Sequence, residues 1–318
     1  MTGQSAAQPA ASPGSPFGPM VVIANPRAGR GKVGTHLPQV EAVLTEAGIS
    51  YRIVRTTHPG HATEAAREAL ARGERYLVAA GGDGTVHEVV NGMIADGRPV
   101  AADAVLGVIA AGSGCDFVRS FGLPGDAVGA ARRLIGDQVR PIDVGRVTFT
   151  DGPAEITRYF PNIAEAGLGG AVVARAARLP ARLGPGRYLA GFWLTLPGFS
   201  PATVRLDADG QAYQWRAHNV VVANCRFYGG GMQISPKSEP DDGALDVLVM
   251  AGPKSDAFTA LPKIYRGTHL PHRNIAELRA GRVRLEADPP FPIEADGETL
   301  GTTPATFEII PAALRLKV

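Results

Sequence analysis

Cysteine is scarce in this chain: only Cys115 and Cys225 occur among its 318 residues. Two cysteines do not make the framework of a disulfide-stabilised secreted protein, so we expect a reduced, cytoplasmic environment. A charge excess of one sign is also lacking, since 32 Lys and Arg residues stand against 30 Asp and Glu residues. A net charge of +2 gives no argument for nucleic-acid binding, and we expect none.

Long apolar runs are lacking as well. The longest candidate, Tyr188–Phe199, is interrupted by Gly191 and Pro197, and it falls short of the roughly 20 apolar residues that cross a bilayer. Residues 1–19 contain neither a basic segment nor an apolar core, which predicts a disordered tail rather than a signal peptide. Any membrane contact should therefore be peripheral.

The most informative stretch begins at Tyr76. The run Tyr76–Ala80 is short, apolar and followed by glycine, as expected for a fully buried strand. Beyond the glycines, apolar residues from Val86 to Met93 recur at helical spacing. The sequence thus predicts a strand, a glycine turn and a helix.

The turn itself favours an anionic ligand. Gly81, Gly82 and Gly84 let a ligand approach the backbone closely, and free N–H groups at a helix N-terminus attract phosphate. Asp83 lies among these glycines, where a carboxylate is repelled by phosphate unless it holds a cation or accepts a proton. The alternative is that Asp83 only caps the following helix.

Two further apolar runs end in glycine-rich loops. Met20–Ala24 precedes a basic loop over residues 25–32, and Val105–Ala110 precedes another glycine loop. The first is not a Walker A loop, because Val33 follows its lysine. Three strand–loop–helix units in succession predict a parallel sheet, and such sheets bind ligands at the carboxyl ends of their strands.

The pattern changes after about Val144, and the domain boundary is expected near Pro141–Gly145. Strand-like segments now recur without long helices, which predicts a second, mainly β domain. These segments are Thr203–Leu206, Asn219–Ala223, Leu245–Met250, Val283–Glu286 and Phe307–Ile310.

The central motif resembles the signature of the diacylglycerol-kinase catalytic-domain family, which includes bacterial lipid kinases and the sphingosine and ceramide kinases. The resemblance lies in Gly81-Gly82-Asp83-Gly84-Thr85 and the following Glu88-Val89-Val90-Asn91-Gly92. NAD kinases and phosphofructokinases carry related turns, but the extension through Asn91-Gly92 is more specific. Further blocks at residues 25–32, 111–117, 164–171, 224–247 and 294–298 are similar to family elements in the same order.

The resemblance implies a fold of the α/β plus β class. After the tail, residues 20–143 would form a three-layer α/β nucleotide-binding domain with a parallel sheet. Residues 144–305 would form a β-sandwich that receives the lipid, and residues 306–318 a last strand that returns to the first domain. The active site is expected in the cleft between the domains.

The implied activity is an ATP- and Mg²⁺-dependent kinase that phosphorylates a membrane lipid, most simply diacylglycerol to phosphatidic acid. Asp296 matches the family's general base, Glu298 supports it, and Asp83 is catalytic and holds the metal together with Asp116. The implied ATP contacts lie in the three glycine loops and nearby: Asn25, Arg27, Gly29, Arg30, Gly31, Lys32, Thr56, Gly81, Gly82, Asp83, Gly84, Thr85, Glu88, Gly112, Ser113 and Gly114.

Two further sites follow from the resemblance. A structural Mg²⁺ is expected on the Asp242 carboxylate and the carbonyls of Glu239 and Ala244; the alternative is an ordinary hairpin turn. Arg187 is expected to contact lipid or phosphate. It belongs to a segment in which arginines alternate with Leu, Tyr, Phe and Trp, a pattern of membrane-surface helices or of a helix packed on the sandwich.

The chain departs from the family at Cys115, where the family has Asn, and at Ala171, where it often has an acid. A different class of function, a nucleotide-responsive lipid-binding protein without catalysis, therefore stays open. Within enzymes, the alternative acceptors are a sphingoid base, ceramide, monoacylglycerol or phosphatidylglycerol. The expected location is cytoplasmic, at the inner face of the membrane, and a homodimer is compatible with the resemblance.

Overall fold

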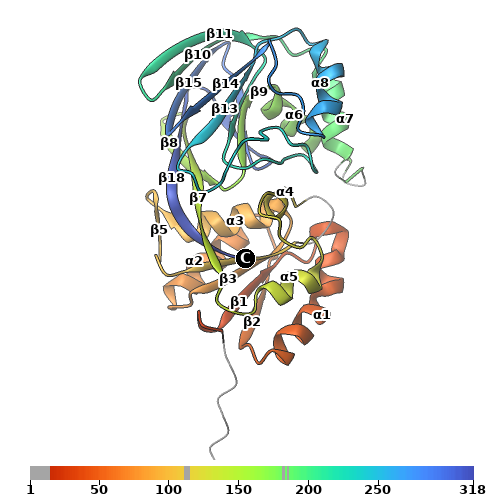
Figure 1. Ribbon diagram of the computed structural model, residues 1–318, viewed down its shortest axis with the longest axis vertical. Coiled ribbons are helices and arrows are strands. Elements are labelled where there is room, and N and C mark those ends of the chain that lie inside the picture. The colour runs from red at the N-terminus through yellow and green to blue at the C-terminus, as the bar shows by residue number, and fades with distance from the viewer. Residues whose placement is uncertain (1–14, 111–114, 181–182, 185) are drawn as a thin grey trace, which may run out of the picture.

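The computed structural model describes residues 15–110, 115–180, 183–184 and 186–318. The chain forms two domains joined end to end (Figure 1). In the first domain the elements are β1 Met20–Ala24, η1 Ala28–Gly31, α1 Lys32–Glu46, β2 Tyr51–Arg55, α2 His61–Ala71, β3 Tyr76–Gly81, α3 Asp83–Met93, β4 Ile94–Ala95, β5 Arg98–Pro99, β6 Val105–Ala110, α4 Asp116–Ser120 and α5 Ala127–Arg133.

This α/β domain has three layers. Strands β2, β1, β3 and β6 pair side by side in that order, and all of these pairings are parallel. Alternate residues of β1 point to opposite faces: Val21 and Ile23 pack with α2, α3 and α4, whereas Met20 and Val22 pack with α1 and α5. Because both faces are covered, the strands β1, β3 and β6 are apolar throughout, as their sequences predicted, whereas the edge strand β2 contains Arg52 and Arg55.

The second domain consists mainly of strands and three helices. Its elements are β7 Val139–Asp151, β8 Ala154–Phe160, β9 Ile163–Gly167, α6 Leu168–Ala177, α7 Gly186–Thr195, β10 Ala202–Ala208, β11 Gln211–Ala217, β12 Asn219–Ala223, β13 Leu245–Met250, α8 Asp256–Ile264, β14 Ile275–Ala280, β15 Arg282–Asp288, β16 Pro292–Ala295, β17 Glu298–Thr302 and β18 Ala305–Lys317.

Two sheets face each other in this β domain. One has the order β14-β13-β12-β9-β16-β17, and the other contains β11, β10, β15, β18, β7 and β8. Val220 and Val222 of β12 point into the core between the sheets, whereas Val221 and Ala223 point to the outer face. The predicted α/β domain followed by a β-sandwich-like domain is confirmed.

One long strand connects the two domains. The first half of β18 pairs with β15 in the β domain, and near its end Arg315 and Leu316 pair in parallel with β6 in the α/β domain (Figure 1). Strand β7 runs alongside it over Val139–Phe149. The boundary expected between residues 143 and 144 lies inside β7, so the limits of the domains stay a prediction.

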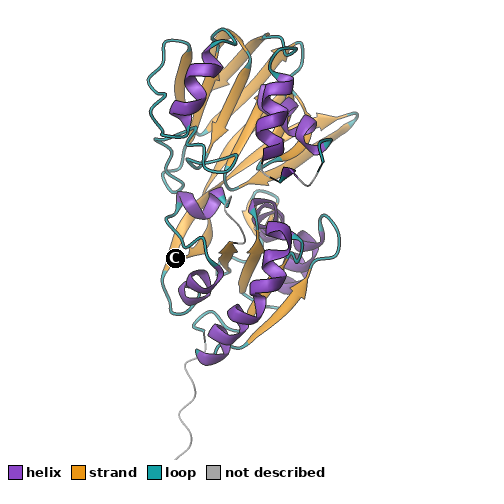
Figure 2. Cartoon of the chain, turned by 90° about the vertical axis from the view of Figure 1, so that its right-hand side faces the viewer, coloured by secondary structure: helices purple, strands orange, loops and turns teal. Residues whose placement is uncertain are grey.

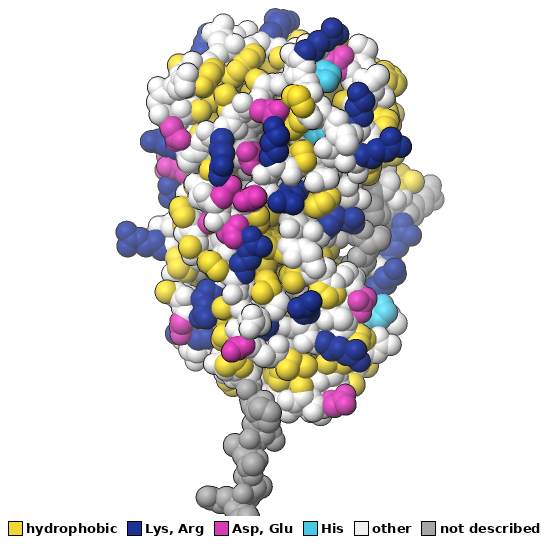
Figure 3. Space-filling view, viewed as in Figure 1, with side chains coloured by type: hydrophobic (Ala, Val, Ile, Leu, Met, Phe, Trp, Pro, Cys, Tyr) yellow, Lys and Arg dark blue, Asp and Glu magenta, His cyan; other side chains and the backbone are white. Residues whose placement is uncertain are grey.

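Helices α6, α7 and α8 cover the outer side of the β domain (Figures 1 and 2). The rings of Trp193 and Phe258 lie 4.9 Å apart and join α7 to α8. Among the described residues, none of the helices has both the length and the apolar character needed to cross a membrane. On the face in Figure 3, basic side chains are interspersed with acidic ones.

Candidate active site at the junction of the two domains

The parallel strands of the α/β domain end in register. Ala24 of β1 pairs with Arg55 of β2 and with Ala80 of β3, and Ala80 pairs with Ile109 of β6. The loops that follow these strands therefore begin at one edge of the sheet, which faces the β domain (Figure 1). This is the edge at which parallel sheets bind ligands.

The first loop has an unusual backbone. Gly29, Arg30 and Gly31 all have positive φ angles of 60°, 61° and 87°, and the Oδ1 atom of Asn25 accepts a hydrogen bond from the N–H of Arg27 at 3.0 Å. A chain in this conformation points successive N–H groups to one side, which suits an anion. Helix α1 then begins at Lys32.

Thr56 lies beside this loop at the end of β2. Its N–H donates to the carbonyl of Ala24 at 2.8 Å. The third glycine loop, with the predicted contacts Gly112, Ser113 and Gly114, lies outside the described residues.

The central turn is tightly packed at one glycine and open at the next. A Cβ atom on Gly81 would lie 2.5 Å from the Cβ of Thr85, whereas a Cβ on Gly82 would have no neighbour within 4 Å. Gly84 faces the β domain, because the Oε1 atom of Glu298 lies 3.9 Å from the position of its Cβ. The turn thus has an open side, and Glu298 is at its edge.

Asp83 joins two helices. It is the first residue of α3, but its carboxylate accepts the N–H groups of Asp116 at 3.1 Å and Phe117 at 3.0 Å, at the start of α4. The thiol of Cys115 lies 3.5 Å from the same carboxylate. Asp83 therefore caps a helix other than its own, and Cys115 replaces the family's Asn within this contact.

Asp83 and Asp116 form a pair of buried acids. Burial raises the pKa of Asp83, and burial together with the charge of Asp83 raises the pKa of Asp116 to about 6. Oδ2 of Asp116 accepts the N–H of Gly230 at 2.7 Å, while its buried Oδ1 accepts no hydrogen bond and lies 3.7 Å from Nε of Arg119.

This pair of acids fits a hard divalent cation. Two carboxylates that repel each other, one with a buried oxygen that accepts no hydrogen bond from the described residues, are oxygen donors of the kind that Mg²⁺ prefers. Among the described residues, no group of three or more His, Cys, Asp and Glu side chains is arranged to hold a metal by itself. A cation here would therefore take further ligands from water or substrate phosphates.

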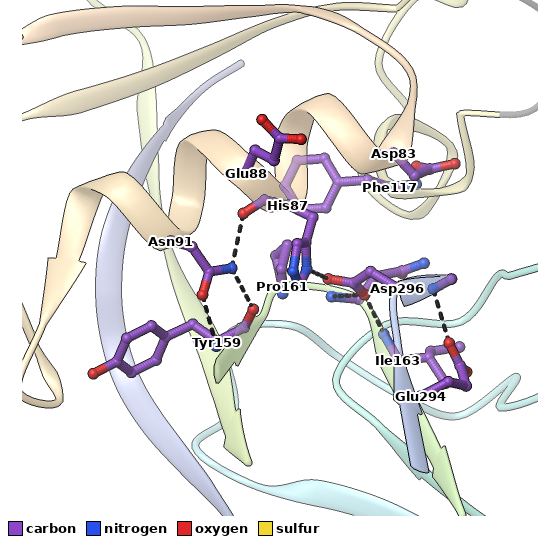
Figure 4. A network of polar contacts seen from close by, with 12 residues as sticks. Asp83, His87, Glu88, Asn91, Phe117, Tyr159, Pro161, Ile163, Glu294 and Asp296 are labelled. Carbon is purple, nitrogen blue, oxygen red and sulfur yellow. Dashed lines mark hydrogen bonds and ion pairs between the residues drawn. The ribbon is translucent and has the colours of Figure 1, made fainter. Parts of the chain in front are cut away.

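The β domain brings Asp296 to this edge. Asp296 lies in the turn between β16 and β17 with a positive φ of 49°. Its Oδ1 accepts the N–H groups of Asn162 at 3.2 Å and Ile163 at 3.0 Å, and its Oδ2 lies 3.0 Å from Nδ1 of His87 on α3 (Figure 4). A hydrogen bond thus crosses directly between the domains.

Asp83 and Asp296 lie on the same side of the junction. The charge of Asp296 contributes to the raised pKa of Asp83, and Figure 4 shows Asp83 one helical turn before His87. Both predicted catalytic acids and the histidine between them therefore face one region.

His87 lies within the predicted helix after the glycine turn, and the sequence analysis assigned it no role. The structure brings its imidazole to Asp296. Asn91, one turn further on, donates to the carbonyls of His87 at 2.9 Å and Tyr159 at 2.8 Å and accepts the N–H of Tyr159. Asn91 belongs to the family block at residues 88–92, and His87 directly precedes it. This block was the sequence feature that could have pointed to both residues.

Glu88 has a structural role in this arrangement. Its Oε2 accepts the N–H of Ala62 at 3.0 Å, and its carbonyl accepts the hydroxyl of Thr63 at 2.7 Å, at the start of α2. A nucleotide contact of Glu88 stays a prediction.

A second pair of buried acids lies behind Asp296. Glu294 of β16 and Glu165 of β9 are register partners on adjacent strands. Glu165 accepts the amide of Asn219 at 3.0 Å, and Glu294 accepts the N–H of Gly297 at 2.8 Å. Burial raises the pKa of both carboxyl groups, and their mutual repulsion raises that of Glu294 further. The sequence analysis did not predict this pair, which depends on the register of β9 and β16.

The turn expected to hold a structural Mg²⁺ is closed by other contacts. The Asp242 carboxylate forms an ion pair with Arg279 and accepts the N–H of Ala244 at 3.1 Å. The carboxylate of Glu239 lies 4.0 Å from Arg226. The metal site at this turn stays a prediction.

Helix α7 reaches the edge of the site. The guanidinium of Arg187 donates to the hydroxyl of Tyr188 at 3.2 Å, and that hydroxyl lies 3.6 Å from where a Cβ of Gly297 would be. The guanidinium of Arg30 from the first loop lies against Gly184. The first loop of the α/β domain therefore contacts the segment that precedes α7.

Comparison with known proteins gives two family matches. The model of the diacylglycerol kinase catalytic domain matches residues 19–147, and that of the YegS C-terminal NAD kinase beta sandwich-like domain matches residues 162–318. Together they span both domains of the structure, and the segment between them, residues 148–161, covers the end of β7 and β8.

Similar proteins extend over nearly the whole chain. A diacylglycerol kinase of Bacillus subtilis (strain 168) is 33% identical over 294 residues, which is 90% of this chain and 91% of that protein. A diacylglycerol kinase of Mycobacterium tuberculosis (strain ATCC 25618 / H37Rv) is 29% identical over 308 residues, 94% and 95% of the two chains. The crystal structure of a diacylglycerol kinase from Bacillus anthracis str. Sterne covers 95% of this chain and 97% of its own, at 25% identity and a TM-score of 0.71.

Proposed function

Since the chain belongs to the diacylglycerol kinase catalytic-domain family and is a lipid kinase of that family, we propose that it transfers the γ-phosphate of ATP to the hydroxyl of a membrane lipid, most simply diacylglycerol. The product would be phosphatidic acid. The observation that carries this proposal is the hydrogen bond between His87 and Asp296, which joins the predicted base to the helix that starts at the glycine turn.

The loops after β1 and β3 are suited to hold the phosphates. Their open glycines, above all Gly82, let phosphate oxygens approach backbone N–H groups. Phosphoryl transfer depends on position and charge rather than on covalent catalysis. A cradle of N–H groups opposite a base therefore provides most of what the reaction needs.

Mg²⁺ would be held by Asp83 and Asp116, with the Oδ1 atom of Asp116, which accepts no hydrogen bond from the described residues, as a ligand in place of its ion pair with Arg119. When bound, the ion would offset the negative charge of the phosphates. The base would be the pair formed by Asp296 and His87, and Glu298, whose carboxylate faces Gly84, would support it from the β domain.

We further propose that α7 and α8 contact the membrane. Large apolar side chains are exposed along them and in the preceding segment: Leu183, Leu189, Leu194, Phe258 and Tyr265. Leu194 is 57% exposed and Phe258 65% exposed, and Arg187 supplies a positive charge beside them. An apolar face flanked by arginine is typical of a surface that binds anionic lipid.

The activity is tested by incubating the protein with γ-labelled ATP, Mg²⁺ and mixed micelles that each contain one lipid alcohol. We expect label in phosphatidic acid with diacylglycerol. Label on a sphingoid base, ceramide, monoacylglycerol or phosphatidylglycerol instead would change the substrate but not the class. Binding of lipid without any transfer would favour the non-catalytic alternative.

Membrane contact is tested by sedimentation with vesicles of phosphatidylglycerol and phosphatidylcholine. Replacing Leu194 and Phe258 by Ser should reduce the bound fraction several-fold. Val100, which is 49% exposed on the α/β domain, provides the matched control, because Val100→Ser removes an exposed apolar side chain elsewhere. Equal binding of both variants would exclude α7 and α8 as the membrane surface.

A further inference from the structure

We propose that His87 is the group that accepts the proton of the lipid hydroxyl, through Nε2, and that Asp296 is a positioning residue that orients the imidazole. This inference rests on the proposed lipid kinase activity. It changes the role that the family resemblance gives to Asp296, and it assigns a catalytic role to a histidine that the sequence left without one.

The first step concerns Asp296. Its carboxylate receives three hydrogen bonds, from the N–H groups of Asn162 and Ile163 and from His87, and its side chain is only 2% exposed. A carboxylate has about four acceptor positions, so three are in use. Only one acceptor position of Asp296 is left for a lipid hydroxyl, on a side chain that is almost completely buried.

The second step concerns the tautomer of His87. An ionised carboxylate only accepts hydrogen bonds, so the Nδ1 atom that faces Asp296 carries the hydrogen. In the neutral ring Nε2 then keeps its lone pair. Among the described residues no hydrogen-bond partner of Nε2 is found, and the His87 side chain is 7% exposed, more than that of Asp296. Both side chains are buried, and Nε2 of His87 is the nitrogen of the pair that is left to accept a proton.

The third step concerns position. His87 is four residues after Asp83 on α3, so both side chains lie on one face of the helix (Figure 4). That helix starts at the glycine turn proposed to hold the phosphates. His87 therefore lies one helical turn from the proposed phosphate site, and we place the incoming lipid hydroxyl between the two.

The chemistry balances within the proposed reaction. The lipid oxygen forms a bond to the γ-phosphorus of ATP, the bond from that phosphorus to the β,γ-bridging oxygen breaks, and ADP leaves. The hydroxyl proton moves to Nε2, which gives an imidazolium paired with Asp296, and then passes to solvent. Asp296 stays ionised throughout, as the orienting carboxylate of an Asp–His pair does.

Other titratable groups lie around the pair. Asp83 lies on the same helix, Cys225 follows β12, and Glu294 is on β16; each interacts electrostatically with Asp296. Glu298 reaches the same side from β17. The charge that the proton brings to the ring forms next to the Asp296 carboxylate, 3.0 Å from Nδ1.

The test compares His87→Asn with the wild type. The Asn amide can still donate to Asp296, so a purely structural role would be kept, but no titratable nitrogen remains at Nε2. We expect kcat to fall roughly 10²- to 10⁴-fold, the KM for ATP to stay within about twofold, and the acidic limb of the pH profile of kcat to disappear. His36→Asn on α1 is the control and should leave the profile unchanged.

A kcat within about threefold of the wild type in His87→Asn would overturn the proposal, and so would a lowered kcat with an unchanged acidic limb. Should Asn lower the melting temperature, His87→Gln is assayed in the same way, since its amide occupies the Nε2 position without a titratable group. Failure of the wild type to label any lipid would instead refute the proposed function and is seen before the variants are compared.

Discussion

The two sides of the junction are built differently. The α/β domain supplies mostly backbone: loops that follow strands directly and contain the glycines of the turns. The β domain supplies side chains that arrive from far along the sequence. Asp83 and Phe117 are 34 residues apart, whereas His87 and Asp296 are separated by 209 residues.

This difference assigns different tasks to the two domains. Backbone turns fixed by neighbouring residues suit the phosphates, which are alike in every nucleotide. Carboxylates held by strand pairing suit the chemistry, because β9, β16 and β17 fix the Asp296 turn on both sides. Changes on the β side, and at His87 which contacts it, should therefore act on turnover, whereas changes in the glycine loops of the α/β domain should act on nucleotide binding and stability.

The largest effect is expected from Asp296→Asn. Its amide can still accept from Asn162 and Ile163, but the nitrogen facing His87 would reverse the tautomer and place the hydrogen on Nε2. We expect kcat to fall on the order of 10³- to 10⁴-fold with ATP binding unchanged, measured by label transfer and calorimetry. Asp143→Asn is the matched control, since Asp143 also accepts two backbone N–H groups, of Gly243 and Ala312.

Asp143→Asn should lower stability without this loss of turnover. Unchanged phosphorylation by the Asp296 variant would remove both Asp296 and its histidine from the chemistry.

A smaller effect is expected from Asp83→Ala, because Asp83 belongs to both tasks. The loss of its carboxylate frees the N–H groups at the start of α4, at a cost of about 1 kcal/mol, and removes one acid of the proposed cation site. We expect a higher KM for ATP, a stronger Mg²⁺ requirement and kcat lowered roughly tenfold or more.

Asp126→Ala separates these effects, since Asp126 caps α5 through the N–H of Gly129 at 2.7 Å. It should show the loss of stability alone. If both variants change the unfolding free energy equally and neither changes the kinetics, Asp83 is only a helix cap.

The same division explains what the sequence could predict. Strands such as Met20–Ala24, Asn219–Ala223 and Leu245–Met250 were predicted with their observed limits, because a short apolar run between polar turns carries its own signal. The order of the domains followed from the change of pattern near Val144. Both features depend on neighbouring residues only.

Contacts between distant segments carried no such signal. His87 follows Thr85 and Val86 in a helix and looks like any helical residue until β16 and β17 bring Asp296 to it. Glu88 was predicted to touch the nucleotide, but the capping of α2 depends on how two helices pack. The pairing of Glu165 with Glu294 depends on strand register, which a single sequence does not reveal.

A pair of glycine substitutions tests the α/β side by itself. Gly81→Ala would bring a methyl group against Thr85, so we expect a loss of about 1–3 kcal/mol in unfolding free energy. Gly82→Ala has open space and a φ of −93°, so stability should hardly change. Its methyl group would instead occupy the place proposed for a phosphate and raise the KM for ATP. An unchanged KM would show that the phosphates do not approach at Gly82.

The smallest effect concerns the dependence of stability on pH, and it tests the β side. Burial raises the pKa of Glu165 and Glu294, so between the ordinary Glu pKa and the raised value the folded state binds more protons than the unfolded state. Stability must then fall as pH rises through this window, by at most about 1.4 kcal/mol per pH unit for each group.

Glu294→Gln removes one of these protons while its amide oxygen still accepts the N–H of Gly297. Urea unfolding from pH 5 upward should therefore give a flatter curve for this variant than for the wild type. The exposed Glu155 on β8 gives the control, because Glu155→Gln removes the same charge without burial and should leave the slope unchanged. Parallel curves for Glu294→Gln and the wild type would mean that Glu294 binds no additional proton in the folded protein.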